Sequence, residues 1–328
     1  MPPFEEPVAL PRGVADADGA RGFVRNAHET IDAIRLDTGA PIWRSDIEAR
    51  PLLVSGARLV AASPSRTREN GLEMFLLDID GQGHVVGRDE LELPDGVSSR
   101  DRRDFEYVIR REGESLALSW RARTRYRGGA YPPEEVSCAE RRDLHGDALL
   151  DPLTGRVSAR DVPSESMFEP DLPPSQPYRV QSVWRESAWR AGSQILRLSV
   201  LGSGEQRTLA LQAVGAEGDG QAKALLEGRR FEAEVTPCGR YVFARTSNLP
   251  GDEWAVFSAK TGERVTTLRY AEGYQWPCVL GERIYYLMTG GPRAAASMTL
   301  RAADLHTGQP VWEHNLDGPG PKPPALAR

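Results

Sequence analysis

One segment occurs twice, near the two ends of the chain, and it limits the possible folds more than any other feature. Ile31–Trp43 reads IDAIRLDTGAPIW, and Leu300–Trp312 reads LRAADLHTGQPVW. Each copy has an apolar-rich stretch, a Thr-Gly pair, a second short stretch, and a Trp five residues after the Thr. Glycine adopts a positive φ without steric cost, so a Thr-Gly pair between two strand-like stretches predicts a tight β-hairpin.

Four looser copies lie between these two. Asp151–Gly155 and Phe257–Gly262 keep the Thr-Gly pair, whereas Asp78–Gly81 and Leu201–Gly204 keep only a small turn. We use one glycine of each of these six turns as its marker, namely Gly39, Gly81, Gly155, Gly204, Gly262 and Gly308. Three of the five spacings between consecutive markers lie between 42 and 49 residues. A β-rich repeat of this length is typical of propeller blades. We predict an all-β chain that forms a single closed β-propeller, with six blades favoured and seven as the alternative.

The repeats resemble those of the PQQ-like propellers of the quinoprotein dehydrogenase superfamily, which read strand, Asp-x-x-Thr-Gly, strand, Trp. Asp151 and Asp304 match the Asp of that pattern, whereas Arg35 and Ser258 replace it in the other two Thr-Gly copies. The stretch from Thr236 to Ser258 instead resembles a WD40 blade. Both resemblances imply a propeller, and neither implies a particular activity.

Quinoprotein catalysis is not expected. The PQQ resemblance implies eight blades, two adjacent cysteines near the quinone, and a calcium site. This chain of 328 residues is too short for eight full blades, and its cysteines are not adjacent. Its five histidines show none of the usual metal-ligand spacings, and no nucleophile motif is present. We therefore predict that the protein binds neither PQQ nor a structural metal.

The ends of the chain differ in composition from its middle. Residues 1–20 are rich in Pro, Asp and Gly and are expected to form an N-terminal arm, with a first outer strand as the alternative. The propeller is expected over 21–316, and the Pro-rich residues 317–328 are expected to be disordered. The longest interval between markers predicts an insertion in the third blade, where Glu134–Leu144 reads as a short helix or irregular excursion.

Composition suggests a location and excludes some partners. The net charge of −6 argues against general affinity for nucleic acids. An odd, scattered set of three cysteines favours reduced thiols. The start of the chain lacks a signal-peptide pattern, and no run of 18 apolar residues occurs. These observations predict a cytoplasmic protein without a membrane attachment.

A row of arginines is the sharpest local feature. In a strand, Arg121, Arg123, Arg125 and Arg127 would share one face, and Trp120, Ala122, Thr124 and Tyr126 would share the other. The structural explanation is pairing with nearby acids such as Glu112, Glu114, Glu134 or Glu135. The functional explanation is docking of an acidic partner or of phosphates. Residues 100–127 contain nine arginines and five acidic residues, which supports a basic surface.

Four aromatic residues form a second candidate site, namely Trp184, Trp189, Tyr274 and Trp276. Tyr and Trp are enriched at the centres of protein interfaces, although packing between blades would also use them.

Two functions fit the sequence. We favour a non-catalytic propeller that binds a protein partner, as a scaffold or as a subunit of a larger complex. The alternative is an enzyme or small-ligand binder that uses the central channel, which would need convergent polar side chains on the innermost strands.

Overall fold

In the computed structural model, every regular element of the described residues is a strand, so the prediction of an all-β chain is confirmed. The structure describes residues 8–80, 82–95, 97–100, 105–123, 143–160, 179–180, 187–191, 194–203, 206–214, 220–236, 239–246, 253–269, 277–289 and 298–318. Within these ranges, no helix is long and apolar enough to span a membrane. The strands form six antiparallel sheets of four or five strands each.

The sheets are named by their order along the chain. The first contains β1 (Val8–Leu10), β2 (Gly13–Ala15), β3 (Arg21–Arg25), β4 (Thr30–Arg35) and β5 (Pro41–Glu48). The second contains β6 (Arg50–Ser55), β7 (Arg58–Pro64), β8 (Gly71–Asp78) and β9 (Val85–Glu92). The third contains β10 (Phe105–Glu112), β11 (Ser115–Arg123), β12 (Asp143–Leu150) and β13 (Val157–Arg160).

The remaining three sheets follow the same plan. The fourth contains β15 (Ser187–Ala191), β16 (Gln194–Ser203), β17 (Gln206–Val214) and β18 (Lys223–Gly228). The fifth contains β14 (Arg179–Val180), β19 (Phe231–Val235), β20 (Tyr241–Thr246), β21 (Glu253–Ser258) and β22 (Arg264–Arg269). The sixth contains β23 (Cys278–Leu280), β24 (Arg283–Thr289), β25 (Met298–Asp304) and β26 (Pro310–Asn315).

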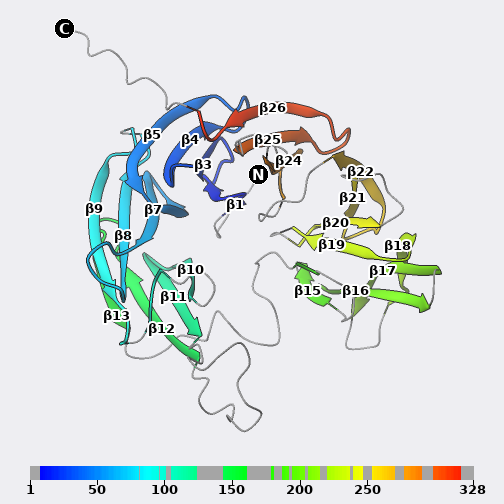
Figure 1. Cartoon of the computed structure of the whole chain (residues 1–328), viewed down its shortest axis with the longest axis horizontal. Helices are drawn as coiled ribbons and strands as arrows, with labels where there is room; N and C mark the ends of the chain where they lie inside the picture. Colours follow the sequence, from blue (N-terminus) through cyan, green and yellow to red (C-terminus); the bar gives the residue numbers. More distant parts are fainter. Residues whose placement is uncertain are drawn as a thin grey trace.

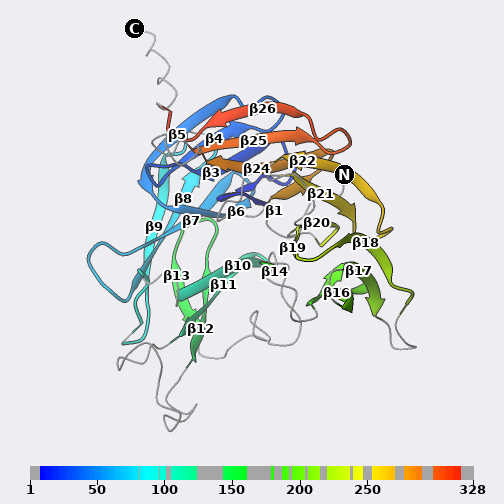
Figure 2. The same ribbon diagram turned by 45° about the vertical axis from the view of Figure 1, so that its right-hand side comes forward.

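The six sheets stand around a common axis in a propeller-like arrangement (Figures 1 and 2). Apolar clusters join the first sheet to the second, the second to the third, the fourth to the fifth and the fifth to the sixth. A further cluster joins the sixth sheet to the first, where Leu287 and Trp312 pack with Leu10 and Ile34. Among the described residues, no such cluster joins the third sheet to the fourth.

The Thr-Gly turns share one geometry. In the sixth sheet, Asp304 accepts hydrogen bonds from the backbone N–H groups of His306 and Thr307, at 3.0 and 2.8 Å, and from the Thr307 hydroxyl. The N–H of Gly308 bonds to the Asp304 carbonyl at 2.8 Å, and Gly308 has a φ of 68°. A short polar side chain that bonds to its own turn favours this reversal, and glycine supplies the positive φ.

Each of four sheets has a β-bulge shortly after the turn into its last strand. One residue of the last strand has no partner on the preceding strand, and that residue is β-branched and apolar: Ile42, Val86, Val265 and Val311. A bulge re-aims the side chains around it. In β5 and β26 the next residue is the Trp of the repeat, which is buried.

Each of these two tryptophans packs on the turn of a neighbouring sheet. Trp312 donates from its indole N–H to the Leu36 carbonyl of the first sheet at 3.0 Å. A Cβ on Gly39 would lie 2.6 Å from the Trp312 ring, so only glycine fits below it. Trp43 repeats the arrangement on Ile79 and Gly83 of the second sheet. The same contact is therefore present between the sixth and first sheets and between the first and second sheets.

Several boundaries differ from those read in the sequence. The stretch 1–20 holds β1 and β2, which extend the first sheet on the side facing the axis (Figure 1). Residues 143–144 of the expected excursion begin β12, and residues 134–142 lie outside the described residues. The marker at Gly204 lies between the second and third strands of its sheet, where the other markers lie before the last strand.

Candidate partner-binding surface

A buried group of titratable side chains joins the first and sixth sheets. Asp32 of β4 accepts hydrogen bonds from Arg44 at 2.5 and 2.8 Å and from the Asn26 amide at 2.9 Å. His314 of β26 places its Nε2 3.5 Å from the Asp32 carboxylate and its Nδ1 3.1 Å from the Gly39 carbonyl. The side chains of Asp32 and Asn26 are almost fully shielded from solvent.

This group holds the first and sixth sheets together. Both ring nitrogens of His314 face acceptors, so neither is directed at a hydroxyl or thiol nucleophile. Burial raises the pKa of Asp32, but hydrogen bonds from Arg44, His314 and Asn26 outweigh burial, and the pKa lies below its ordinary value. Arg44 also donates to the Gly318 carbonyl at 2.8 Å. The carboxylate therefore holds together parts of the chain that are far apart in sequence.

The arginine row begins on the third sheet, as its alternation predicts. Trp120 and Ala122 of β11 are buried in the cluster that joins the third sheet to the second. Arg121 points to the opposite face, where it pairs with Glu106 of β10 at 3.0 Å. The two residues lie directly opposite each other in the β10–β11 register. The structural explanation of the row, pairing with an acid, therefore holds at Arg121, and the acid is Glu106.

The same face carries further polar groups. Arg160 of β13 forms two hydrogen bonds with Glu112 of β10, at 2.9 and 3.1 Å, and these lower the pKa of Glu112. Ser119 donates a short hydrogen bond to Asp147 of β12, and both residues are buried. We call this face, defined by Glu106, Glu112, Ser119, Arg121, Asp147 and Arg160, the polar face of the third sheet.

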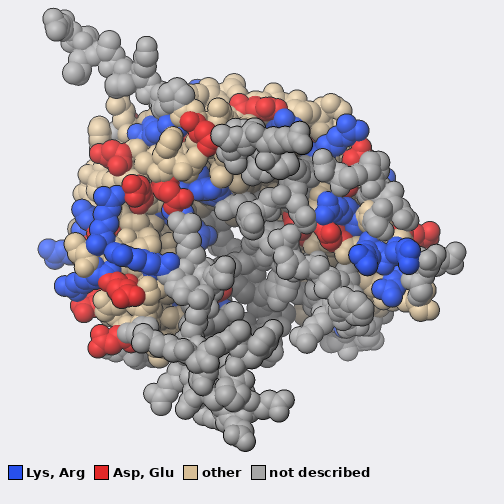
Figure 3. Space-filling model, in the orientation of Figure 1, with Lys and Arg blue, Asp and Glu red and all other residues tan. Residues whose placement is uncertain are grey.

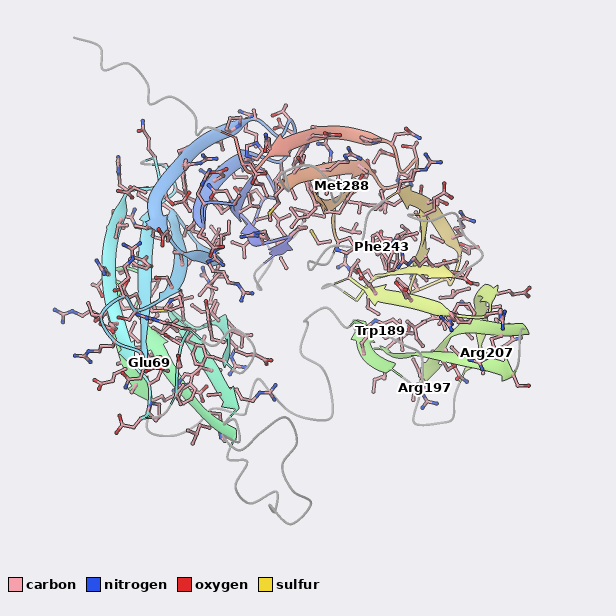
Figure 4. All side chains as sticks on the ribbon, in the orientation of Figure 1. Glu69, Trp189, Arg197, Arg207, Phe243 and Met288 are labelled. Carbon is pink, nitrogen blue, oxygen red and sulfur yellow. The ribbon has the colours of Figure 1, made fainter. Side chains whose placement is uncertain are left out.

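The fourth sheet also has one apolar and one polar face. Its apolar side packs against the fifth sheet through Trp189, Leu198 and Leu209. Cross-strand pairs place polar residues on the other side, where Arg197 lies opposite Gln212 and Ser199 opposite Ala210 (Figure 4). Among the described residues, the third and fourth sheets each contribute to one apolar cluster, and the other four contribute to two. Polar faces therefore border the junction between the third and fourth sheets.

The other predicted residues divide into three groups. Arg123 ends β11 and lies opposite Asp143 of β12 in the register. Trp189 is 5% exposed and donates to the Gly239 carbonyl at 3.0 Å, so it is a packing residue between the fourth and fifth sheets (Figure 4). The rest lie outside the described residues: Arg125, Arg127, Trp184, Tyr274 and Trp276.

Sequence reasoning missed Leu153, which is 84% exposed in the turn between β12 and β13. A comparison of the four Thr-Gly turns in the sequence sets this residue apart. The residue before the Thr is polar in three of them, as Asp37, Lys260 and His306, and it is Leu153 in the fourth. Single exposed apolar side chains are common on protein surfaces, so the exposure of Leu153 does not by itself identify a binding site.

Potential metal ligands do not converge in the described part of the chain, since no group of three or more His, Cys, Asp or Glu side chains there could hold an ion. The absence of a cofactor remains a prediction.

No protein-family model and no curated protein sequence matches the chain. Apo AztD from Citrobacter koseri is similar in structure, with 10% identity, a TM-score of 0.36 and coverage of 94% of this chain and 87% of AztD. Puromycin hydrolase shows 12% identity and a TM-score of 0.39 over 96% of this chain and 55% of its own. The Dos1 propeller shows 10% identity and a TM-score of 0.28, covering 92% and 68%. No conclusion about this chain rests on scores of this size.

Proposed function

We propose that this chain is a closed six-bladed β-propeller that binds a protein partner without catalysing a reaction, as a scaffold or as a subunit of a larger complex. The proposal rests on the difference between the two faces of the third sheet. One side packs through Trp120, Ala122 and their neighbours, and the other presents ion pairs and buried polar groups. Ser119 and Asp147 are buried on that side, so the proposed partner meets the ion pairs at its edge, where the side chains of Glu106 and Glu112 are 46% and 40% exposed.

The proposed partner is acidic where it meets the third sheet. Residues 100–127 carry nine arginines and five acidic residues, in a chain whose net charge is −6. Glu106 pairs with Arg121 at 3.0 Å, so the first arginine of the row is balanced by an acid. Steering by the row would then depend on the arginines beyond Arg121, and it would weaken as salt screens their charge.

A reducing, cytoplasmic location is part of the proposal and is supported by the odd, scattered set of three cysteines in the sequence. No observation on the described residues favours the alternative of an active site in the central channel.

The experiment is partner capture by a variant that carries Arg123→Glu and Arg125→Glu. Partners captured from the native host by the wild-type protein would be identified by mass spectrometry, and the same partners would be quantified on the variant. The matched control carries Arg264→Glu and Arg269→Glu, the same charge change on β22 of the fifth sheet. We expect the first variant alone to lose the partner, at an unchanged melting temperature.

A further inference from the structure

His314 of β26 is the one buried histidine of this protein. All five histidines lie within the described ranges, and the other four are exposed, namely His28, His84, His145 and His306. His314 is 9% exposed, and Asp32, which it faces, is 1% exposed. The space-filling view shows acidic and basic side chains spread together over the surface, where water and salt screen them (Figure 3). The contact between His314 and Asp32 is screened much less, so the charge of this ring affects the junction between the first and sixth sheets.

Both partners of the His314 ring are hydrogen-bond acceptors. Nδ1 lies 3.1 Å from the Gly39 carbonyl oxygen, and Nε2 lies 3.5 Å from the Asp32 carboxylate. Although burial raises the pKa of Asp32, its hydrogen bonds hold that pKa below the ordinary value, so the carboxylate supplies no proton of its own. A neutral imidazole has one N–H, and each neutral tautomer therefore directs a nitrogen lone pair at one of the two acceptors. The imidazolium ion has two N–H groups and satisfies both.

Among the described residues, Arg44 is the charged side chain that shares the Asp32 carboxylate with His314. Its positive charge opposes a second cation at this place, whereas the two acceptors around the ring favour one. Arg44 also reaches outward to the Gly318 carbonyl, and its side chain is 18% exposed, so water reaches part of its charge. The two acceptors contact the ring directly, and we expect them to outweigh the repulsion.

The other charged side chains near this junction bond elsewhere. Arg283 of β24 donates to backbone carbonyls in the turn between β4 and β5, and Asp37 of that turn pairs with an arginine at the surface. Glu313 pairs with Arg301 on the opposite face of β26. Asp317 accepts from a backbone N–H at the start of β25. The charge of His314 therefore depends chiefly on Asp32, Arg44 and the Gly39 carbonyl.

We propose that His314 carries a proton on both ring nitrogens in the folded protein, and that this charge makes the junction between the first and sixth sheets sensitive to pH. The two acceptors favour the charged ring in the folded chain more than water does in the unfolded chain. The stabilisation is therefore present at low pH and is lost as pH rises and the ring becomes neutral. This inference concerns the stability of the fold and is independent of the proposed partner.

Nitrogen NMR of the histidine rings tests the charge directly, because protonated and unprotonated ring nitrogens differ in chemical shift. At about pH 7.5, one unit above the ordinary histidine pKa, a histidine in water is mostly neutral. The His314 ring should show two protonated nitrogens at that pH, and the four exposed rings should show one each. Loss of the signals in His314→Gln assigns them, and single substitutions of the other four histidines assign them if that variant does not fold.

Urea unfolding between about pH 5.5 and pH 8.5 tests the effect on stability. His314→Gln keeps an amide donor but takes no charge, and His84→Gln is the control because it changes an exposed histidine. The folding equilibrium constant of the wild type, divided by that of His314→Gln, should fall about tenfold over this range as one charge-assisted hydrogen bond is lost. The ratio for His84→Gln should stay constant. A neutral His314 ring at about pH 7.5, or a His314→Gln ratio that does not fall as pH rises, would overturn the proposal.

Discussion

Replacing Gly39 with alanine tests the contact that joins the sixth sheet to the first. Gly39 has a φ of 72°, and a Cβ there would lie 2.6 and 2.7 Å from two atoms of the Trp312 ring. The variant therefore suffers in two ways, through an unfavourable backbone conformation and through a clash. Gly113 separates the two, because its φ is 62° and nothing lies within 4 Å of its Cβ position.

The expected magnitudes follow from these two terms. A left-handed conformation costs a non-glycine residue about 1–2 kcal/mol. Overpacking in a tight contact adds about 1–3 kcal/mol. Gly113→Ala should lower the free energy of unfolding by the first term alone, and Gly39→Ala should lower it by both. The difference between the variants, about 1–3 kcal/mol, measures how tightly Trp312 packs on the turn.

Urea unfolding followed by tryptophan fluorescence, with circular dichroism as a second probe, gives both free energies. Adding Gly39→Ala to a Trp312→Leu variant provides a further check, because without the ring the glycine substitution should cost only the backbone term relative to Trp312→Leu alone. Equal destabilisation by Gly39→Ala and Gly113→Ala would refute the packing contact between the sixth and first sheets.

Two further predictions concern the same junction. Asp32→Asn should lower the free energy of unfolding by about 3 kcal/mol at pH 7, because it breaks a buried ion pair with Arg44. The depressed pKa of Asp32 means that this stabilisation is present above the ordinary carboxyl pKa and is lost as pH falls through the folded-state value. The difference between wild type and variant in urea unfolding should therefore shrink below about pH 4. Removal of residues 316–328 should cost about 2–5 kcal/mol, because Leu316 is fully buried and its carbonyl accepts from the Ala27 N–H, whereas removal of 319–328 should leave thermal unfolding unchanged.

The fold could be predicted largely because its signals are local. The strand, turn and Trp of the repeat lie within 13 residues, and hydrogen bonds inside the turn fix the geometry of each copy. The Gly204 marker was misplaced because a Gly-Ser-Gly turn suits any hairpin, whereas the turn before a last strand uses a Thr-Gly pair in four sheets. Ser258 shows that the Asp can be replaced, since its hydroxyl accepts from the Thr261 N–H at 3.3 Å.

The candidate site was harder to predict, because its contacts depend on the strand register and on residues far apart in the sequence. Alternation predicted the faces of Trp120 and Arg121, but the acid opposite Arg121 depends on the strand register. The hairpin at Gly113 pairs Glu112 with Ser115 and therefore Glu106 with Arg121. The contact between Asp32 and His314 spans 282 residues and requires the first and sixth sheets to lie side by side. No local pattern could have indicated it.

Partner capture by the Arg123→Glu, Arg125→Glu variant is the measurement that tests the central claim most directly. It should be made at equal folded fraction, beside the Arg264→Glu, Arg269→Glu control and over a series of salt concentrations. The account predicts that the first variant loses the partner, that the control keeps it, and that wild-type capture weakens as salt increases. Unchanged capture by the first variant, or a loss of capture that parallels a loss of thermal stability, would show that the arginine row is structural and contradict the account.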